Sequence, residues 1–204
     1  MVYVHGYFTD VDRAWKGHRL AEQFAISRMN AMFIVCGAPR SPRENVDWDS
    51  LDALLASVGR ELDASLPEGS VIAIGHSGAH RTLSTWLETE RLATVVLIDA
   101  LYGEQPEFKR WIEADPARRL IDVGDLTRPW TDDLHAALPE TLVFDAFPPR
   151  AVGRLSGART ARIVYVRSTI GHMALVTDGI ALPMLLGALR LPLVPATPSI
   201  EPLE

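Results

Sequence analysis

Short apolar runs alternate with longer amphipathic stretches along most of the chain. The runs are rich in β-branched residues and have little polar alternation, which is typical of strands buried on both faces of a parallel sheet. They predict strands at 2–4, 31–36, 71–74, 94–98, 119–123 and 162–167.

The amphipathic stretches predict helices at 13–28, 48–66, 77–92, 107–114, 131–138 and 173–189. In the second of these, leucines at 51, 54, 55 and 62 fall on one face, and Asp47 or Asp49 is placed to cap the helix. Regular alternation of strands and helices indicates right-handed crossovers. We therefore expect an α/β/α three-layer sandwich around a mostly parallel sheet of about six strands. Functional residues should gather at the carboxyl ends of its strands.

One segment combines a strand, a tight turn and a helix within a few residues. Residues 71–80 read VIAIGHSGAH, so Gly75-His76-Ser77-Gly78-Ala79 follows a buried strand directly. This matches the nucleophile-elbow pattern G-x-S-x-G, except that Ala79 replaces the last glycine. Alanine is still small enough for the strand and helix to pack closely. The turn predicts a strained serine, Ser77, with its hydroxyl exposed.

Three other strands end in residues that fit the same chemistry. Val2–Val4 runs into His5-Gly6, the strand at 94–98 ends in Asp99, and the strand at 162–167 is followed by Gly171-His172. With the elbow at Ser77, these motifs resemble the α/β-hydrolase superfamily over nearly the whole chain. The resemblance implies a small serine hydrolase, similar to esterases and lipases. The chain lacks room for a cap domain, so we expect a minimal fold with an open, lidless cleft.

The resemblance assigns a role to each candidate catalytic residue. Ser77 is the nucleophile, His172 the general base, and Asp99 the acid that orients the base. Asp125 stays open as an alternative acid, because Gly124-Asp125 resembles the turn in which most members carry it. The remaining histidines have lesser expected roles: His76 in packing, His5 in holding its loop by hydrogen bonds, and His18 and His135 at the surface.

Two backbone N–H groups should stabilise the oxyanion of the acyl intermediate. By resemblance they belong to Gly78, which follows the nucleophile, and to Tyr7, which follows the His-Gly turn. Phe8, Tyr102 and Trp130 fall on loops near the same edge. They form a substrate-binding wall or simply seal the core, and both readings stay open.

Composition narrows the possible partners and compartments. The chain has 204 residues and a net charge of −6, with its Lys and Arg residues scattered, which argues against nucleic acid as a partner. The single cysteine, Cys36, permits no intramolecular disulfide, and no run reaches the roughly 18 apolar residues of a membrane span. We expect the cytoplasm for the sequence as written; a secreted or periplasmic location stays open if a leader precedes Met1. No zinc-ligand spacing or glycine-rich phosphate loop is present, so no metal or cofactor is expected.

We expect one α/β-hydrolase domain over 1–190, a surface loop over 145–162, and a proline-rich tail over 191–204. The expected function is hydrolysis of an ester, thioester or amide bond through an acyl-enzyme. The substrate would be a small-molecule or polymer-borne acyl compound. An acyltransferase with the same triad and a non-catalytic binding scaffold remain as alternatives. The oligomeric state stays open.

Overall fold

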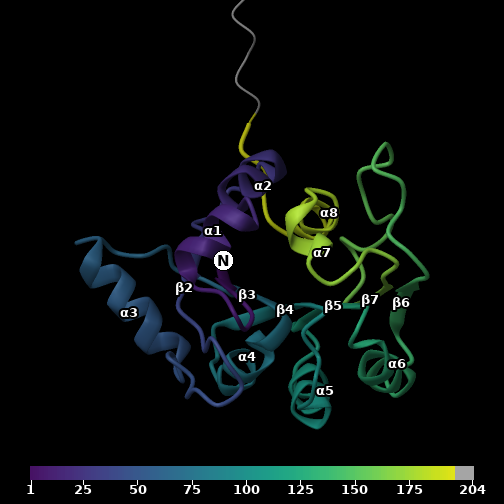
Figure 1. The fold of residues 1–204 in the computed structure, drawn as a ribbon, viewed down its shortest axis with the longest axis horizontal. Coiled ribbons are helices and arrows are strands. Elements are labelled where there is room, and N and C mark those ends of the chain that lie inside the picture. The colour runs from purple at the N-terminus through teal and green to yellow at the C-terminus, as the bar shows by residue number, and fades with distance from the viewer. Residues whose placement is uncertain (196–204) are drawn as a thin grey trace, which may run out of the picture.

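The computed structural model describes residues 1–195. Its centre is one sheet of seven parallel strands in the order β2-β1-β3-β4-β5-β7-β6 (Figure 1). The strands are β1 (Val2–Val4), β2 (Ile34–Cys36), β3 (Val71–His76), β4 (Leu92–Ile98), β5 (Arg119–Gly124), β6 (Thr141–Phe144) and β7 (Ile163–Arg167). The predicted α/β class and parallel sheet are confirmed.

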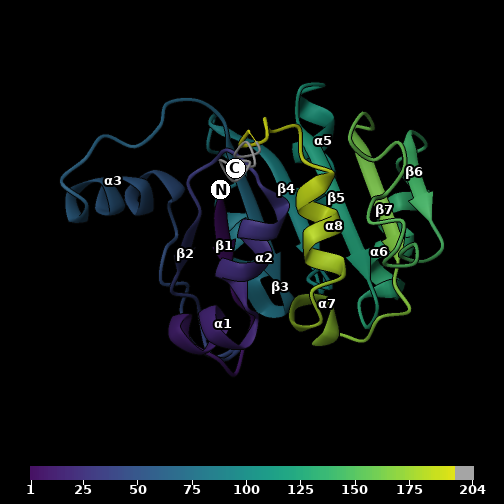
Figure 2. The ribbon, with the colours of Figure 1, turned by 90° about the horizontal axis from the view of Figure 1, so that it is seen from above.

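Helices cover both faces of the sheet (Figure 1). One layer holds α1 (Val11–Gly17), α2 (Leu20–Ser27), α7 (Ala174–Thr177) and α8 (Ala181–Gly187). The other holds α3 (Leu51–Glu61), α4 (His80–Thr85), α5 (Gln105–Ala114) and α6 (Arg128–Ala136). Figure 2 shows α2 and α8 lying side by side over the sheet.

Alternation along the strands creates a separate apolar core under each helical layer. In β1, Val2 and Val4 join the core against α3, α4, α5 and α6, whereas Tyr3 joins the core against α2, α7 and α8. All three side chains are completely buried. The central strands therefore form a rigid platform for the loops at their carboxyl ends.

The structure has one strand more than predicted. β6 (Thr141–Phe144) lies at the edge of the sheet and pairs with β7. Its residues are only partly buried, and Val143 is exposed. The run Leu142-Val143-Phe144 is as apolar as the predicted strand at 2–4, so the sequence carried a signal for this strand that the prediction left out.

Two predicted helices are each interrupted. The helix expected at 13–28 divides into α1 and α2 around His18 and Arg19, and Arg19 has a left-handed φ of 50°. The helix expected at 173–189 divides into α7 and α8 beside Gly179, whose φ is 69°. Apolar periodicity continues across both breaks because the two helices of each pair lie in the same layer on one face of the sheet. The apolar pattern therefore gave no sign of the change in backbone direction at either break.

The segments predicted to be irregular differ from one another. Residues 145–162 contain no helix or strand, although Leu155 and Ala158 in this loop are buried in the core. The first residues of the predicted tail lie along 28–30, where Leu193 pairs with Met29 and the Val194 N–H donates to the Arg28 carbonyl. Residues 196–204 of that tail lie outside the described part.

Within residues 1–195, no helix has both the length and the apolar character needed to cross a bilayer.

Candidate active site

Ser77 lies at the sharp turn between β3 and α4. Its φ is 56°, a left-handed conformation that costs energy for a residue other than glycine. A short 3₁₀ turn, Ser77–Ala79, leads into α4. A Cβ on Gly75 would lie 2.5 Å from Leu83 Cδ1 and 2.9 Å from Ala79 Cβ, so only glycine allows this approach of strand and helix. The alanine at 79 is accommodated, as its size predicts.

The loop after β1 passes directly over the turn. A Cβ on Gly6 would lie 2.5 Å from Ser77 Cβ, and one on Gly78 would lie 2.5 Å from the Tyr7 ring. The two expected oxyanion-hole residues, Tyr7 and Gly78, are therefore neighbours beside Ser77. The His5 ring, which is buried, hydrogen-bonds through Nδ1 to the Gly6 carbonyl and braces this loop, as expected.

His172 and Asp99 are brought together from loops that are far apart in sequence. His172 Nδ1 lies 2.5 Å from Asp99 Oδ2. The Asp99 side chain is completely buried, and the His172 side chain is one-fifth exposed. A carboxylate only accepts hydrogen bonds, so His172 Nδ1 is the donor to Asp99, and Nε2 is the ring nitrogen that faces away from this carboxylate.

The turn after β5 holds the Asp99 carboxylate. Oδ1 accepts hydrogen bonds from the Asp125 N–H at 2.9 Å and from both the N–H and the hydroxyl of Thr127 at 2.8 Å. Oδ2 also accepts from the Leu126 N–H at 3.2 Å. Burial alone would raise the pKa of Asp99, but the hydrogen bonds from His172, Thr127 and Asp125 outweigh it and lower the pKa to about 2. Asp125, the alternative acid, contributes its N–H rather than its carboxylate to this cluster.

Two more histidine rings extend the site inward from His172. The His76 ring lies 4.5 Å from the His172 ring, and its Nε2–H donates to the His172 carbonyl at 3.2 Å. The His18 ring meets the His76 ring edge to face at 5.5 Å. Burial, with a further contribution from the neighbouring His172 and His18, lowers the pKa of His76 to about 3, so this ring is neutral. His76 has the packing role that the sequence predicts.

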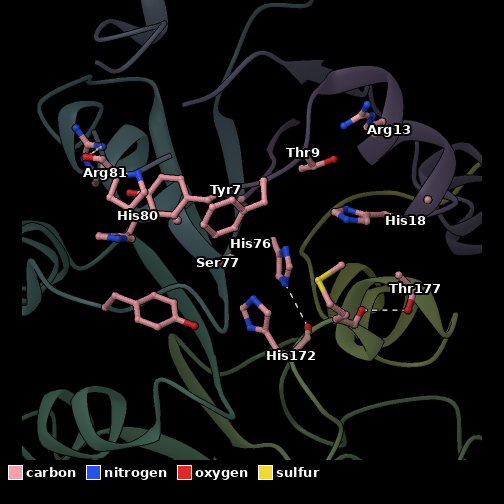
Figure 3. A pocket seen from close by; sticks show the side chains of 17 residues that line it. Tyr7, Thr9, Arg13, His18, His76, Ser77, His80, Arg81, His172 and Thr177 are labelled. Atoms are coloured by element: carbon pink, nitrogen blue, oxygen red, sulfur yellow. Dashed lines mark hydrogen bonds between the residues drawn. The ribbon is translucent and has the colours of Figure 1, made fainter. Parts of the chain in front are cut away.

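A pocket of about 890 Å³ opens over these residues (Figure 3). Ser77 and His172 both line it, and Ser77 is partly exposed. Among residues 1–195 there is no hydrogen bond between the Ser77 hydroxyl and the His172 ring. Residues 145–162 do not line this pocket. Its other lining side chains include Tyr7, Phe8, Thr9, Arg13, His18, His80, Arg81, Tyr102, Met173 and Thr177.

The predicted aromatic residues have different positions relative to the pocket. Tyr7, Phe8 and Tyr102 line it, and Phe8 is the most exposed, at 83%. Trp130 does not line it but packs against Tyr102, with ring centroids 5.8 Å apart.

Sequence reasoning missed most of the polar residues in the pocket wall, among them two buried histidines. His80 Nδ1 lies 2.5 Å from a Glu104 carboxylate oxygen, a second histidine–carboxylate pair. His18, expected at the surface, is only 4% exposed, and its Nδ1 lies 2.9 Å from the Tyr3 hydroxyl. His135 was also wrongly expected at the surface: it is buried against Asp122. Residues distant in sequence bury these three rings, so no local sequence pattern predicts their burial.

In the part of the chain that the structure describes, no group of three or more His, Cys, Asp or Glu side chains could hold a metal ion.

Comparison with known proteins identifies the fold. No family model and no curated protein match the sequence. Among solved structures, a ferulic acid esterase superimposes with a TM-score of 0.57 over 91% of this chain and 84% of that chain, at 10% sequence identity. The protein has an α/β-hydrolase fold. The methylesterase MES16 from Arabidopsis aligns with a TM-score of 0.43 at 15% identity, over 91% of this chain and 95% of that one.

Proposed function

We propose that the protein is a serine hydrolase that cleaves an ester bond through an acyl-enzyme. The observation that carries this proposal is the contact of His172 with the buried Asp99, because His172 lines the same pocket as Ser77, which is held at a strained turn. Burying an ionised carboxylate against an imidazole costs desolvation energy. Such a pair is expected where the carboxylate orients a histidine that acts as a catalytic base. The esterase fold of the structural neighbour supports the same reaction class.

The contacts support a role for each residue. Because Asp99 keeps the proton of His172 on Nδ1, Nε2 is free to accept the Ser77 proton as Oγ attacks the acyl carbon. The negative charge of Asp99 then stabilises the imidazolium. His172 returns the proton to the leaving alcohol. Water then attacks the acyl-enzyme, while His172 accepts its proton and passes it to Ser77 Oγ as the acid product leaves. We assign the oxyanion hole to the N–H groups of Gly78 and Tyr7.

Ser77 and His172 make no hydrogen bond in the ligand-free protein, which is common among catalytic pairs that tighten only around a substrate. The pocket wall at Tyr7, Phe8 and Tyr102 offers apolar and stacking area for the substrate. The loop at 145–162 leaves the pocket uncovered. We therefore propose an acyl substrate that extends beyond the pocket, either a bulky small molecule or a group on a polymer.

The test is covalent labelling with a fluorophosphonate probe, read by intact mass and peptide mapping. We expect one equivalent of label on Ser77 and hydrolysis of short p-nitrophenyl esters. Ser77→Ala should abolish both, whereas Ser70→Ala, at an exposed serine just before β3, should keep both. Label that persists in Ser77→Ala would contradict the proposal. Adding an alcohol during turnover distinguishes water from an alcohol as the acyl acceptor.

A further inference from the structure

His18 is a buried polar residue that the proposed hydrolysis does not use. It lies at the junction of α1 and α2 and lines the same pocket as Ser77. Figure 3 shows its ring reaching into the pocket on the side of Thr9 and Arg13, with His76 between it and His172. The Gln23 amide donates to the His18 carbonyl and to the Val176 carbonyl, which fixes the backbone beneath the ring. The structure therefore holds this imidazole in one orientation.

The Tyr3 hydroxyl determines the tautomer of His18. Tyr3 is completely buried in β1, and within the described residues its hydroxyl has one hydrogen-bond partner, His18 Nδ1 at 2.9 Å. Burial raises the pKa of Tyr3, so the phenol keeps its proton. A buried hydroxyl needs an acceptor, and Nδ1 is the one present. Tyr3 therefore donates to Nδ1, and the proton of the neutral His18 ring is on Nε2.

The remaining nitrogen of His18 is a donor without a protein acceptor. Burial, followed by repulsion from His5, lowers the pKa of His18 to about 4, so the ring is neutral near pH 7. In residues 1–195, Nε2 has no hydrogen-bond partner. It is also not a fully buried atom, since the buried polar atoms without a partner do not include it. Since His18 lines the pocket, this N–H is accessible from inside it.

The neighbouring side chains favour a particular class of ligand. The Thr177 hydroxyl donates to the Met173 carbonyl at 3.0 Å, which leaves its oxygen as an acceptor in the pocket wall. A hydroxyl on the substrate can accept from His18 Nε2–H and donate to a threonine oxygen. The wall at Tyr7 and Tyr102, by contrast, is aromatic.

We propose that His18 is a specificity-determining residue whose Nε2–H binds a hydroxyl group of the substrate. The proposal rests on the serine hydrolase function and narrows its substrates to hydroxylated esters. Tyr3 acts as a positioning residue, because it keeps the proton of His18 on the nitrogen that faces the ligand.

The first experiment measures the tautomer and needs no activity. Long-range ¹H–¹⁵N correlation spectra of the imidazole nitrogens should show the Nε2–H form of His18 from pH 6 to 8. In Tyr3→Phe, which removes only the donor, the signal should move toward a mixture of the two neutral forms. A wild-type His18 that is protonated on Nδ1 would overturn the proposal.

The second experiment measures discrimination between esters of matched size. Glyceryl monobutyrate and n-propyl butyrate differ by hydroxyls on the alcohol, and methyl 3-hydroxybutyrate and methyl butyrate differ by a hydroxyl on the acyl group. We expect His18→Leu to reduce the preference in kcat/KM for the hydroxylated member of one pair by about 3- to 10-fold, the effect of one hydrogen bond. His18→Gln, which keeps an N–H donor near the Nε2 position, should restore part of that preference.

The outcomes separate binding from packing and from the proposed reaction. If His18 only supports the His76 ring, His18→Leu lowers kcat/KM equally for both members of each pair, which overturns the proposal. If the wild type hydrolyses no ester, Ser77→Ala is titrated with glyceryl monobutyrate while the His18 Nε2–H resonance is followed. A saturable shift of this resonance would support the hydroxyl-binding site while the hydrolase function is rejected. If the resonance does not shift, the hydroxyl-binding site is rejected as well.

Discussion

Asp99→Asn is the substitution that most directly separates the roles of the residues around His172. In the native protein, Asp99 Oδ1 accepts three hydrogen bonds, and Oδ2 accepts those of Leu126 and His172. An amide has a single acceptor oxygen, which the three donors at Oδ1 will bind. The NH₂ group then faces His172 Nδ1, which must become an acceptor. The ring proton moves to Nε2, where it blocks proton transfer from Ser77.

Both activity and stability should respond. Amidation of a triad acid lowers kcat by roughly 10⁴-fold through the wrong histidine tautomer, about 5.5 kcal/mol in the barrier. The native carboxyl has a pKa of about 2 against 3.8 without the fold, so its charge contributes about 2 kcal/mol near neutral pH. A lowered carboxyl pKa stabilises the protein above about pH 4, and this contribution is lost as the pH falls toward 2. The stability difference between wild type and variant should shrink over the same window.

The assay combines p-nitrophenyl ester turnover with urea unfolding at several pH values. Asp125→Asn is the matched control, since it leaves the Asp125 N–H bond to Asp99 unchanged. We expect it to keep kcat within about twofold and to unfold like the wild type. If Asp99→Asn keeps more than a tenth of the wild-type kcat, Asp99 does not orient the base. A large loss in Asp125→Asn with little effect at Asp99 would move the acid to Asp125.

Three shorter predictions concern the turn, the wall and the open pocket. Gly6→Ala should greatly reduce labelling of Ser77, because the added Cβ meets Ser77 Cβ at 2.5 Å, whereas Gly171→Ala, with no atom within 4 Å, should label normally. Tyr102→Ala should raise KM for aryl esters more than for alkyl esters, and an equal rise for both would argue against a stacking wall. Activity on a soluble ester should rise smoothly through its solubility limit, and an abrupt increase at the interface would indicate a lid.

The parts of the site that sequence could predict are those that follow an apolar run. Ser77, Asp99 and His172 each follow an interior strand of the sheet, so parallel topology alone brings them to one edge. The central strands were visible for the same reason. The edge strand β6 was missed although Leu142-Val143-Phe144 is apolar, and the structure leaves these residues partly exposed at the edge of the sheet.

Contacts between distant segments were beyond the reach of local patterns. His18 is buried because β1 presents the Tyr3 hydroxyl to it, and nothing near His18 in sequence indicates that partner. The choice between Asp99 and Asp125 likewise depended on which of them offers its carboxylate to His172. That choice follows from the shape of the turn after β5 and not from either residue's neighbours in sequence.

The hydrogen bonds that fix the Asp99 carboxylate come mostly from the main chain of the turn after β5, which affects how the sequence of this site can change. Asp125 and Leu126 contribute only main-chain N–H groups, which every residue except proline supplies. Evolution and protein engineering can therefore replace both side chains while keeping these hydrogen bonds to Asp99. Leu126 is 59% exposed, which makes this turn a convenient position for randomised libraries or attachment chemistry. Relatives that share the same geometry need not share any recognisable sequence motif there.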